Sequence, residues 1–278
     1  MSKSSFINQR SNFWDKNPCG GQWLSFKQKR DWLIKTEPYI LDFIHRDWLK
    51  DKKVLDVGCG QGLILSLMAQ ECPDITGIDL SRKSLLQANK GLNELGLKHV
   101  KLAQGNAENL PFNDNVFDLI YCIGVLHHTP NIQKGIAQIN RVLKEDGQAI
   151  IMLYRKYTPK WLAVIILRSF SALIDKIAGQ KYYLANKLRH SKKFHNQKTG
   201  TALLELFGCP ILKTYSSREI KKLFHAFKSA KLSYAQPGFQ RLMDFLPRPR
   251  PFFSKISYWL DRKTKRLFGF YVVIEVKK

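Results

Sequence analysis

The sequence predicts an α/β fold: a doubly wound, mainly parallel sheet of seven strands with helices on both faces and helical insertions. Two observations carry this prediction. From Lys53 onward, short apolar runs alternate with segments of helical periodicity, and strands separated by helices of this length form parallel βαβ units. Near the end of the chain, Phe268–Val276 is rich in β-branched and aromatic residues, which is typical of a strand.

The regular part of the chain contains strands and helices in alternation. Strands are expected at Lys53–Val57, Asp74–Asp79, Val100–Gln104, Phe117–Ile123 and Gln148–Tyr154. Helices are expected at Gly62–Glu71, Arg82–Leu95 and Ile132–Leu143. Residues 50–154 are therefore predicted to be the core of a single α/β domain.

Residues 1–49 are predicted to form an aromatic-rich helical cap. They hold four of the six tryptophans, namely Trp14, Trp23, Trp32 and Trp48. One helix is expected over Phe26–Glu37, and a second is expected to start at Pro38, a residue suited to a first helical position. In that second helix Ile40, Ile44 and Trp48 would share one face.

The alternation lapses after Tyr154, and residues 155–214 are predicted to be a basic helical insertion. Ser216 and Glu219 then form a capping box that begins a helix, and a strand is expected at Lys231–Gln236. Residues 238–266 begin with a Pro-rich stretch and are expected to be a second, irregular insertion. Residues 215–278 would thus complete the sheet around that insertion.

Composition excludes several protein classes. With 44% hydrophobic and 24% charged residues the chain can bury a core and is not intrinsically disordered. The five cysteines are scattered and form no C-x-x-C pair, which argues against a disulfide scaffold and against a zinc site. The first residues, MSKSSFINQR, lack the apolar region of a signal peptide, and no stretch approaches the ~20 apolar residues of a membrane span. We expect a cytoplasmic protein without a bound metal.

The positive charge is concentrated in the second half of the chain. Of the formal net charge of +24, residues 1–150 contribute +3, from 19 basic and 16 acidic side chains, and residues 151–278 contribute +21, from 27 and 6. Such a region should attract an anionic surface: acidic lipid headgroups, nucleic acid or a charged substrate. The alternative is a Lys-rich surface that serves only solubility.

A glycine loop carries the clearest sign of a ligand site. Val54-Leu55-Asp56-Val57-Gly58-Cys59-Gly60-Gln61-Gly62 runs from a strand through a loop into a helix. Glycines at alternate positions let the backbone pass close to a ligand, and the loop ends where helical N–H groups point outward. The acid Asp56 just before the loop disfavours a pyrophosphate but suits a cofactor that bears an ammonium group.

Polar residues also follow the next three strands. Asp79, at the end of the second strand, is placed to accept hydrogen bonds from ribose hydroxyls. The third strand leads into Gly105-Asn106-Ala107-Glu108, and the fourth leads into Gly124-Val125-Leu126-His127-His128. Ligands bind at the carboxyl ends of parallel strands, so the sequence predicts one site built from these four segments.

These segments together give the chain a clear resemblance. VLDVGCGQG, GIDLS, NAENLPF, DLIYCIGVLHHTP and VLKEDGQAIIML occur in the order and spacing typical of class I S-adenosylmethionine-dependent methyltransferases with a Rossmann-like fold. The chain is similar to the type 11 group, which includes ubiquinone and menaquinone methyltransferases. The resemblance extends over about two thirds of the chain and implies S-adenosyl-L-methionine as the cofactor.

The resemblance also implies roles for particular residues. Gly58, Cys59, Gly60 and Gly62 would shape the loop around the methionine part, with Asp56 at its ammonium group. Asp79 would hold the ribose hydroxyls and Leu80 would cover the adenine. Asn106, where the family usually has Asp, and Ala107 would contact the adenine edge, because Asn can still accept from an amino group. The backbone around Ile123 would line the sulfonium side.

Methyl transfer from a sulfonium is an in-line displacement, and holding the two reactants in line accounts for much of its acceleration. A base is needed only if the acceptor must lose a proton. His128, and after it His127, are the candidates, because both follow the fourth strand. The alternative is that the pair packs or bonds to backbone.

The segments outside the core should select the acceptor. Trp161–Ile177 has apolar residues at helical spacing, and Lys181, Lys187, Arg189, Lys192 and Lys193 follow it. This pattern resembles an interfacial membrane helix or a lid over an apolar substrate, and an ordinary core helix is the alternative.

A second basic cluster adds to this charge. It interleaves Arg248, Arg250, Arg262, Lys263, Lys265 and Arg266 with Phe252, Phe253, Tyr258 and Trp259, and it could seat lipid headgroups or RNA phosphates.

Three hypotheses about function follow. The first is a methyltransferase for a small-molecule acceptor, apolar or anionic, that works in the cytoplasm or peripherally at the inner membrane surface. The second, less favoured, is an RNA-modifying methyltransferase whose basic half binds nucleic acid. The third is a non-catalytic binding protein on the same fold, against which the intact loop with Asp56 and Asp79 speaks.

Overall fold

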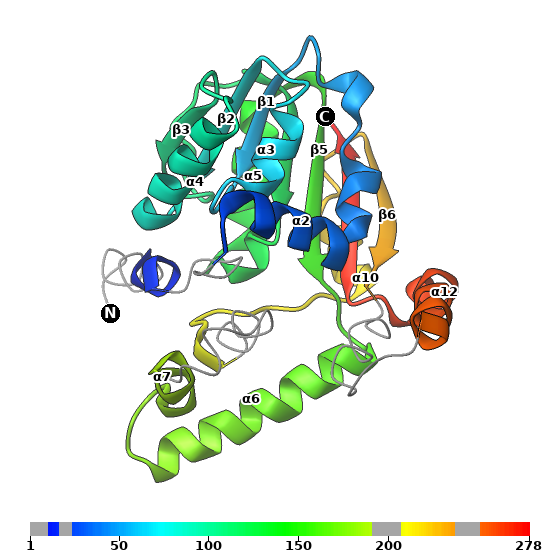
Figure 1. Cartoon of the computed structure of the whole chain (residues 1–278). Coiled ribbons are helices and arrows are strands. Elements are labelled where there is room, and N and C mark those ends of the chain that lie inside the picture. The colour runs from blue at the N-terminus through cyan, green and yellow to red at the C-terminus, as the bar shows by residue number, and fades with distance from the viewer. Residues whose placement is uncertain (1–10, 17–23, 191–206, 237–250) are drawn as a thin grey trace.

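A seven-stranded sheet runs through the molecule in the order β3-β2-β1-β4-β5-β7-β6 (Figure 1). The computed structural model describes residues 11–16, 24–190, 207–236 and 251–278. The strands are β1 (Lys53–Val57), β2 (Asp74–Asp79), β3 (Lys101–Gln104), β4 (Phe117–Ile123), β5 (Leu143–Tyr154), β6 (Ser229–Ala235) and β7 (Tyr271–Lys277). β7 is antiparallel to both of its neighbours, and the other pairings are parallel. The predicted mainly parallel sheet of seven strands is confirmed.

The parallel register aligns the carboxyl ends of the central strands. Asp56 of β1 pairs with Gly77 of β2 on one side and with Tyr121 of β4 on the other. The segments that follow β1, β2, β3 and β4 therefore leave the sheet at one edge, which is the lower edge in Figure 1. That edge is where ligands bind in sheets of this kind.

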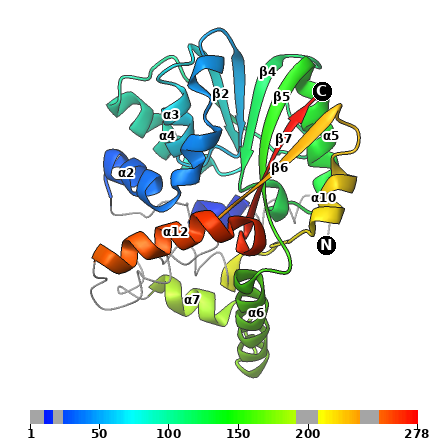
Figure 2. The ribbon, with the colours of Figure 1, turned by 90° about the vertical axis from the view of Figure 1, so that its right-hand side faces the viewer.

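Helices cover both faces of the sheet (Figure 2). On one face, α3 (Leu63–Met68) and α4 (Arg82–Glu94) pack with α2 (Phe26–Thr36) and the 3-10 helix η1 (Pro38–Phe43) around Leu65, Tyr121 and Ile150. On the other face, α5 (Ile132–Val142) and α10 (Ser217–Leu223) pack against Ile120 and Ile151. Two apolar clusters separated by one sheet are what double winding requires.

Three helices lie beyond the lower edge of the sheet rather than on its faces. These are α6 (Pro159–Ile177), α7 (Tyr183–His190) and α12 (Pro251–Phe268), all below the strands in Figure 1. The helix expected over Trp161–Ile177 is therefore present as α6. The division of the chain at residues 49, 154 and 214 stays a prediction.

Most predicted boundaries lie within two residues of the observed ones, and two predictions were wrong. The helix expected from Pro38 is two 3-10 turns, η1 and η2 (Arg46–Trp48), because the backbone of Ile44 and His45 leaves helical geometry between them. Residues 238–266 were expected to be irregular, but their described part, residues 251–266, belongs to helix α12. Pro251 occupies the first position of that helix, where its missing N–H costs nothing, and no Gly or Pro follows until Gly269.

The strand expected at Gln148–Tyr154 begins earlier, at Leu143, so that β5 includes Asp146 and Gly147. The register between β4 and β5 shifts there, and Asp146 has a φ of 62°. Both observations fit a bulge in β5 that interrupts the pairing with β4.

Candidate functional site

A cavity of about 230 Å³ opens at the carboxyl ends of β1, β2 and β4. Its walls come from the four segments that the sequence singled out and from two segments near the N-terminus. Of the predicted site residues it is lined by Gly58, Cys59, Gly60, Asp79, Leu80, Asn106, Ala107, Ile123 and His128. Asp56, Gly62 and His127 do not line it. The structure thus brings most of the predicted site into one hollow.

The glycine loop has positive φ at all three of its glycines. Gly58 and Gly60 differ in what surrounds them. A Cβ on Gly58, at φ +76°, would lie 2.2 Å from Cγ2 of Val125, so this glycine permits close packing of two loops. A Cβ on Gly60, at φ +54°, would meet nothing within 4 Å. Gly60 therefore keeps open space beside the backbone, as a loop that approaches a ligand needs.

Asp79 is held in a fixed orientation at the end of β2. Its Oδ2 accepts the Gly60 N–H at 2.8 Å and its Oδ1 accepts the Ser81 N–H at 2.7 Å. Burial raises the pKa of Asp79, while these backbone donors act in the opposite direction. Because each carboxylate oxygen can accept more than one hydrogen bond, the side chain can still receive the hydroxyls of a diol.

Asp56 is a buried acid without a compensating cation. Its Oδ2 makes no hydrogen bond within the described part of the chain. Burial, and after it the charge of Asp79, raises the pKa of Asp56 to about 7. The side chain lies at the root of the glycine loop rather than in the cavity wall, so its predicted contact with an ammonium group stays a prediction.

The remaining cavity residues are mostly apolar. The side chains of Leu80, Ala107 and Ile123 offer hydrocarbon surface, and the Oδ1 of Asn106 accepts the Glu108 N–H at 3.0 Å. Burial raises the pKa of the Cys59 thiol well above its ordinary value, so this cysteine is a neutral lining group and not a nucleophile.

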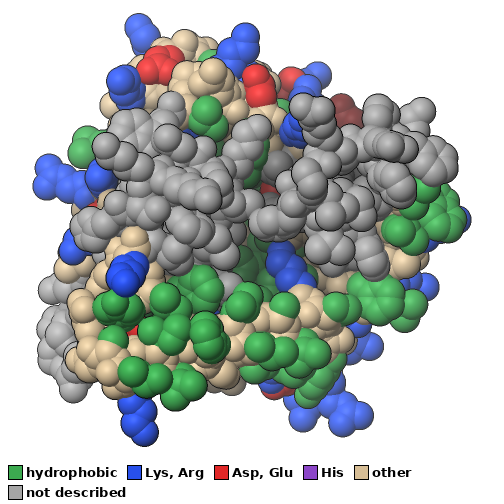
Figure 3. Space-filling model, turned by 60° about the horizontal axis from the view of Figure 1, so that its bottom comes forward, with side chains coloured by type: hydrophobic (Ala, Val, Ile, Leu, Met, Phe, Trp, Pro, Cys, Tyr) green, Lys and Arg blue, Asp and Glu red, His purple; other side chains and the backbone are tan. Residues whose placement is uncertain are grey.

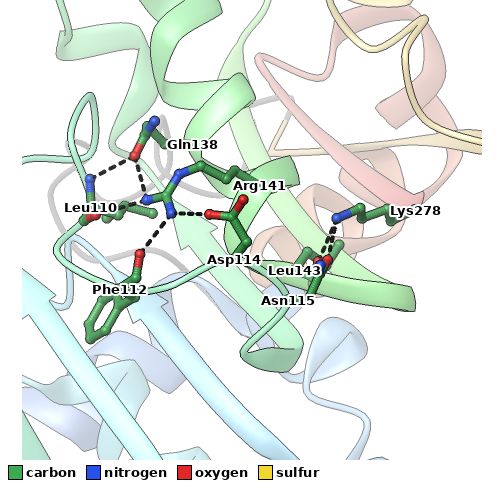
Figure 4. Close-up of polar contacts among 8 residues, drawn as sticks. All are labelled: Leu110, Phe112, Asp114, Asn115, Gln138, Arg141, Leu143 and Lys278. Atoms are coloured by element: carbon green, nitrogen blue, oxygen red, sulfur yellow. Dashed lines mark hydrogen bonds and ion pairs between the residues drawn. The ribbon is translucent and has the colours of Figure 1, made fainter.

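Arg141 fixes the segment that carries Asn106 and Ala107, a role that sequence reasoning missed (Figure 4). From α5 its guanidinium donates to the carbonyls of Phe112 at 2.8 Å and Leu110 at 3.0 Å, and it also bonds Asp114 and Gln138. The part of the segment after β3 from Leu110 to Asp114 is thereby tied to α5. Nothing in the local sequence pattern indicates which segment an arginine on a helix reaches.

The two histidines differ in their surroundings. His127 is fully buried, and its ring stacks on Tyr154 with 3.8 Å between centroids. Burial, and to a lesser degree His128, holds the pKa of His127 well below its ordinary value. His128 lines the cavity, and its Nδ1 lies 2.8 Å from the carbonyl oxygen of Ile211. Because a carbonyl only accepts, Nδ1 carries the proton and Nε2 is the nitrogen able to take one up.

The N-terminal cap contributes residues that the sequence did not single out for the site. Trp14 and Leu33 line the cavity, and the ring of Trp14 lies 5.2 Å from that of His128. Helical residues 11–16 are anchored beside β2, where the Ser81 hydroxyl donates to Oδ1 of Asp15 at 2.6 Å. The aromatic richness of residues 1–49 was the available signal.

These features fit S-adenosylmethionine as a group. A buried, uncompensated carboxyl lies below the loop, an oriented carboxylate can receive a ribose diol, and apolar side chains can flank an adenine. The open space at Gly60 lets a ligand lie against the backbone between them.

Comparisons with known proteins agree with the fold and the loop. The family described as "Methyltransferase domain" matches residues 55–151. The chain is 36% identical over 113 residues to the uncharacterized methyltransferase YcgJ of Bacillus subtilis, covering 40% of this chain and 43% of that protein. It is 32% identical over 213 residues to the ubiquinone biosynthesis O-methyltransferase of Aromatoleum aromaticum, covering 70% of this chain and 86% of that one.

A solved structure gives the same picture of the fold. A SAM-dependent methyltransferase from Thermotoga maritima superposes with a TM-score of 0.55 at 15% identity, covering 96% of this chain and 99% of that one. The chain spans less than two thirds of the length of the first curated relatives it matches, at 43%, 66% and 56%.

Proposed function

The chain belongs to the class I S-adenosylmethionine-dependent methyltransferases, and we propose that it transfers a methyl group from S-adenosylmethionine to a small, apolar acceptor. One observation carries the proposal. A single cavity joins the glycine loop and Asp79 to His128 and Trp14, so a cofactor and an acceptor can lie in contact within it. Holding two reactants in line is the main requirement of this chemistry.

In this proposal the residues of the chain bind the cofactor and orient it toward the acceptor. S-adenosylmethionine supplies a methyl group already activated on a sulfonium. Asp79, with both oxygens oriented by backbone N–H groups, would hold the ribose hydroxyls, and Asp56 would attract the ammonium group from the root of the glycine loop. Leu80 and Ala107 cover the adenine and exclude water from it.

His128 is the group that can take a proton from the acceptor. Its Nδ1–H bond to Ile211 fixes the ring and leaves Nε2 basic, which is how a general base is commonly oriented. His127 has no such role, because its ring is enclosed and stacked on Tyr154. The pair therefore divides into one cavity residue and one packing residue.

The acceptor is proposed to be apolar because of what surrounds His128. Trp14, Leu33, Ile64 and Val125 line the cavity, and no Lys or Arg from the described residues does. An apolar compound with a hydroxyl on a ring fits these walls and gives His128 a proton to remove. The name of the Aromatoleum relative, an O-methyltransferase of ubiquinone biosynthesis, supports a test with such compounds.

The test is a turnover assay with methyl-labelled S-adenosylmethionine and a panel of hydroxylated apolar aromatics. We expect labelled product, with kcat about 10²–10⁴-fold lower in His128→Asn and little change in KM. His225→Asn, an exposed histidine in the turn that follows α10, is the matched control. Product formation by His128→Asn at the wild-type rate would remove the base from the proposal.

The assay also separates the alternatives. Transfer to RNA, with none to the aromatic panel, would favour the nucleic-acid enzyme. Cofactor binding without transfer to any acceptor class would favour the non-catalytic protein.

A further inference from the structure

Helix α6 turns a row of large apolar residues outward, while its inward side combines Trp161 and Val164, which pack against the core, with polar residues. The residues facing the body of the molecule recur every three or four positions and are Trp161, Val164, Arg168, Ser171 and Asp175. The opposite side exposes Leu162, Ile165, Ile166, Phe170, Leu173 and Ile177, which we call the α6 apolar face. A helix that covers a core has the reverse arrangement.

Polar contacts fix this orientation. Arg168 donates to the Cys209 carbonyl at 3.2 Å, and the Trp161 indole donates to the Thr214 hydroxyl at 3.1 Å. At the other end, Asp175 accepts the backbone N–H groups of Tyr182 at 2.7 Å and Tyr183 at 2.9 Å. The apolar face is therefore outward because its polar opposite is bonded inward.

The α6 apolar face lies in a strongly basic part of the chain. Residues 159–190 contain six Lys or Arg residues and one acid, Asp175, whose oxygens are occupied by the turn to α7. Lys176, Lys181 and Lys187 are exposed. Figure 3 shows hydrophobic side chains gathered across this side of the molecule, with Lys and Arg around them.

The described part of α12 repeats the combination of exposed apolar and basic residues. Ile256, Trp259 and Leu267 are exposed, and Arg262, Lys263, Lys265 and Arg266 lie between or beside them. The other basic and aromatic residues predicted for the two clusters, at 189, 192, 193, 248, 250, 252, 253 and 258, lie outside the residues or side chains that the structure describes.

We propose that the α6 apolar face lies on an anionic lipid bilayer. An apolar stripe with lysines at its margins is the arrangement by which helices bind in the plane of a membrane interface, since the hydrocarbon inserts while the cations meet acidic headgroups. None of the described helices is long and apolar enough to span a bilayer, and an in-plane helix of 19 residues needs no such length. The net charge of +21 in residues 151–278 supplies the complementary charge.

This orientation also connects the bilayer to the cavity. Arg168 of α6 bonds the carbonyl of Cys209, whose Sγ lies 3.4 Å from Nδ1 of His128. Among the described residues, the segment around Cys209 and Ile211 links α6 to the cavity histidine. An acceptor dissolved in the membrane would thus meet the protein close to where His128 acts.

The composition of the face favours lipid over nucleic acid. One of its six residues is aromatic, whereas proteins that bind single-stranded RNA stack bases on several aromatic rings. The aliphatic residues of this face would make no favourable contact with the phosphate backbone of a nucleic acid. A second copy of the chain would have to place its own +24 charge against the same basic surface.

The test is sedimentation of the full chain with phosphatidylcholine vesicles containing or lacking phosphatidylglycerol, without cofactor. We expect binding to the anionic vesicles, a loss of at least about tenfold in partition in Phe170→Asp, and wild-type binding in Leu86→Asp. Leu86 is the matched control, because it is a 63% exposed leucine on α4, compared with 56% for Phe170. Circular dichroism and titration with S-adenosylmethionine establish that both variants fold.

Four results would overturn the proposal. The first is absence of binding to anionic vesicles by the wild type, and the second is equal binding by Phe170→Asp. The third is a wild-type dimer in sedimentation velocity that Phe170→Asp dissociates, and the fourth is binding of single-stranded RNA in place of vesicles. Since no turnover is measured, failure here leaves the proposed methyl transfer standing.

Discussion

Helices α5 and α6 are both amphipathic, and they turn their apolar sides in opposite directions. In α5, Ile132, Ile136 and Ile139 are buried against the sheet. In α6, Ile165, Ile166 and Phe170 are exposed, while Trp161 packs against the core and Arg168 bonds the Cys209 carbonyl. Apolar periodicity therefore predicts an amphipathic helix, but it does not predict whether the apolar side packs against the core or faces outward.

The largest expected effect is on the free energy of unfolding, when an aspartate replaces an apolar residue of α5 and, for comparison, one of α6. Ile136→Asp would bury a carboxylate in α5 without a partner, and we expect a loss of more than about 4 kcal/mol in unfolding free energy, or failure to fold. Ile166→Asp, at a site 58% exposed, should change it by less than about 0.5 kcal/mol. Urea denaturation measures both, and similar losses would mean that α6 packs as α5 does.

The second prediction concerns the core, where the burial of Asp56 should make the free energy of unfolding depend on pH. Its pKa of about 7 in the folded chain lies above its unfolded value of about 3.9, so the folded state holds an extra proton between these pH values. Stability without cofactor should therefore fall as pH rises from about 4 to about 7, by up to roughly 4 kcal/mol. In Asp56→Asn most of this fall should disappear.

The control for this experiment is Asp74→Asn, at the exposed start of β2. Denaturation at pH 5 and pH 8 measures the slope. An unchanged slope in Asp56→Asn would show that another group carries it, Asp79 being the first to examine because burial raises its pKa also.

Substitutions at two glycines with nearly the same φ distinguish the cost of backbone strain from the cost of a steric collision. Gly58 and Gly96 have φ of 76° and 75°, but a Cβ would collide with Val125 at Gly58 and would meet nothing at Gly96. We expect Gly58→Ala to cost about 3 kcal/mol and Gly96→Ala about 1 kcal/mol in unfolding free energy. Equal costs would mean that the glycine loop and the segment after β4 are not in contact.

The smallest expected effect concerns Arg141. Arg141→Met removes four hydrogen bonds, most of them to the segment after β3, and should lower unfolding free energy by about 1–2 kcal/mol. It should also weaken S-adenosylmethionine binding several-fold, because Asn106 and Ala107 lose their support. Lys90→Met, on the exposed side of α4, is the control, and unchanged affinity in Arg141→Met would limit the arginine to stability.

The strands and loops of the proposed cofactor site were predictable, because each is indicated by a short run of neighbouring residues. Strands at Lys53–Val57, Asp74–Asp79 and Phe117–Ile123 have the expected bounds, and the loop and acid that follow them occupy one cavity. Trp14 and Arg141 act across long sequence separations, so no pattern near them indicates their contacts. The burial of His127 depends on Tyr154 of β5, which is equally remote in sequence.

The direction of α6 could not be predicted for a related reason. The sequence contains the apolar stripe, but the bonds from Arg168 and Asp175 that turn it outward exist only in the folded chain. The prolines before and at the first residue of α12, Pro251, similarly obscured this helix in the sequence.

The most direct test of the whole account is a calorimetric titration of the purified chain with S-adenosylmethionine. Asp79→Ala, in the cavity, and Asp74→Ala, at the opposite end of the same strand, are measured beside the wild type. The account predicts binding by the wild type and Asp74→Ala and a loss of at least about tenfold in Asp79→Ala. Equal affinity in all three proteins, or no binding by the wild type, would contradict the assignment of this cavity as the cofactor site.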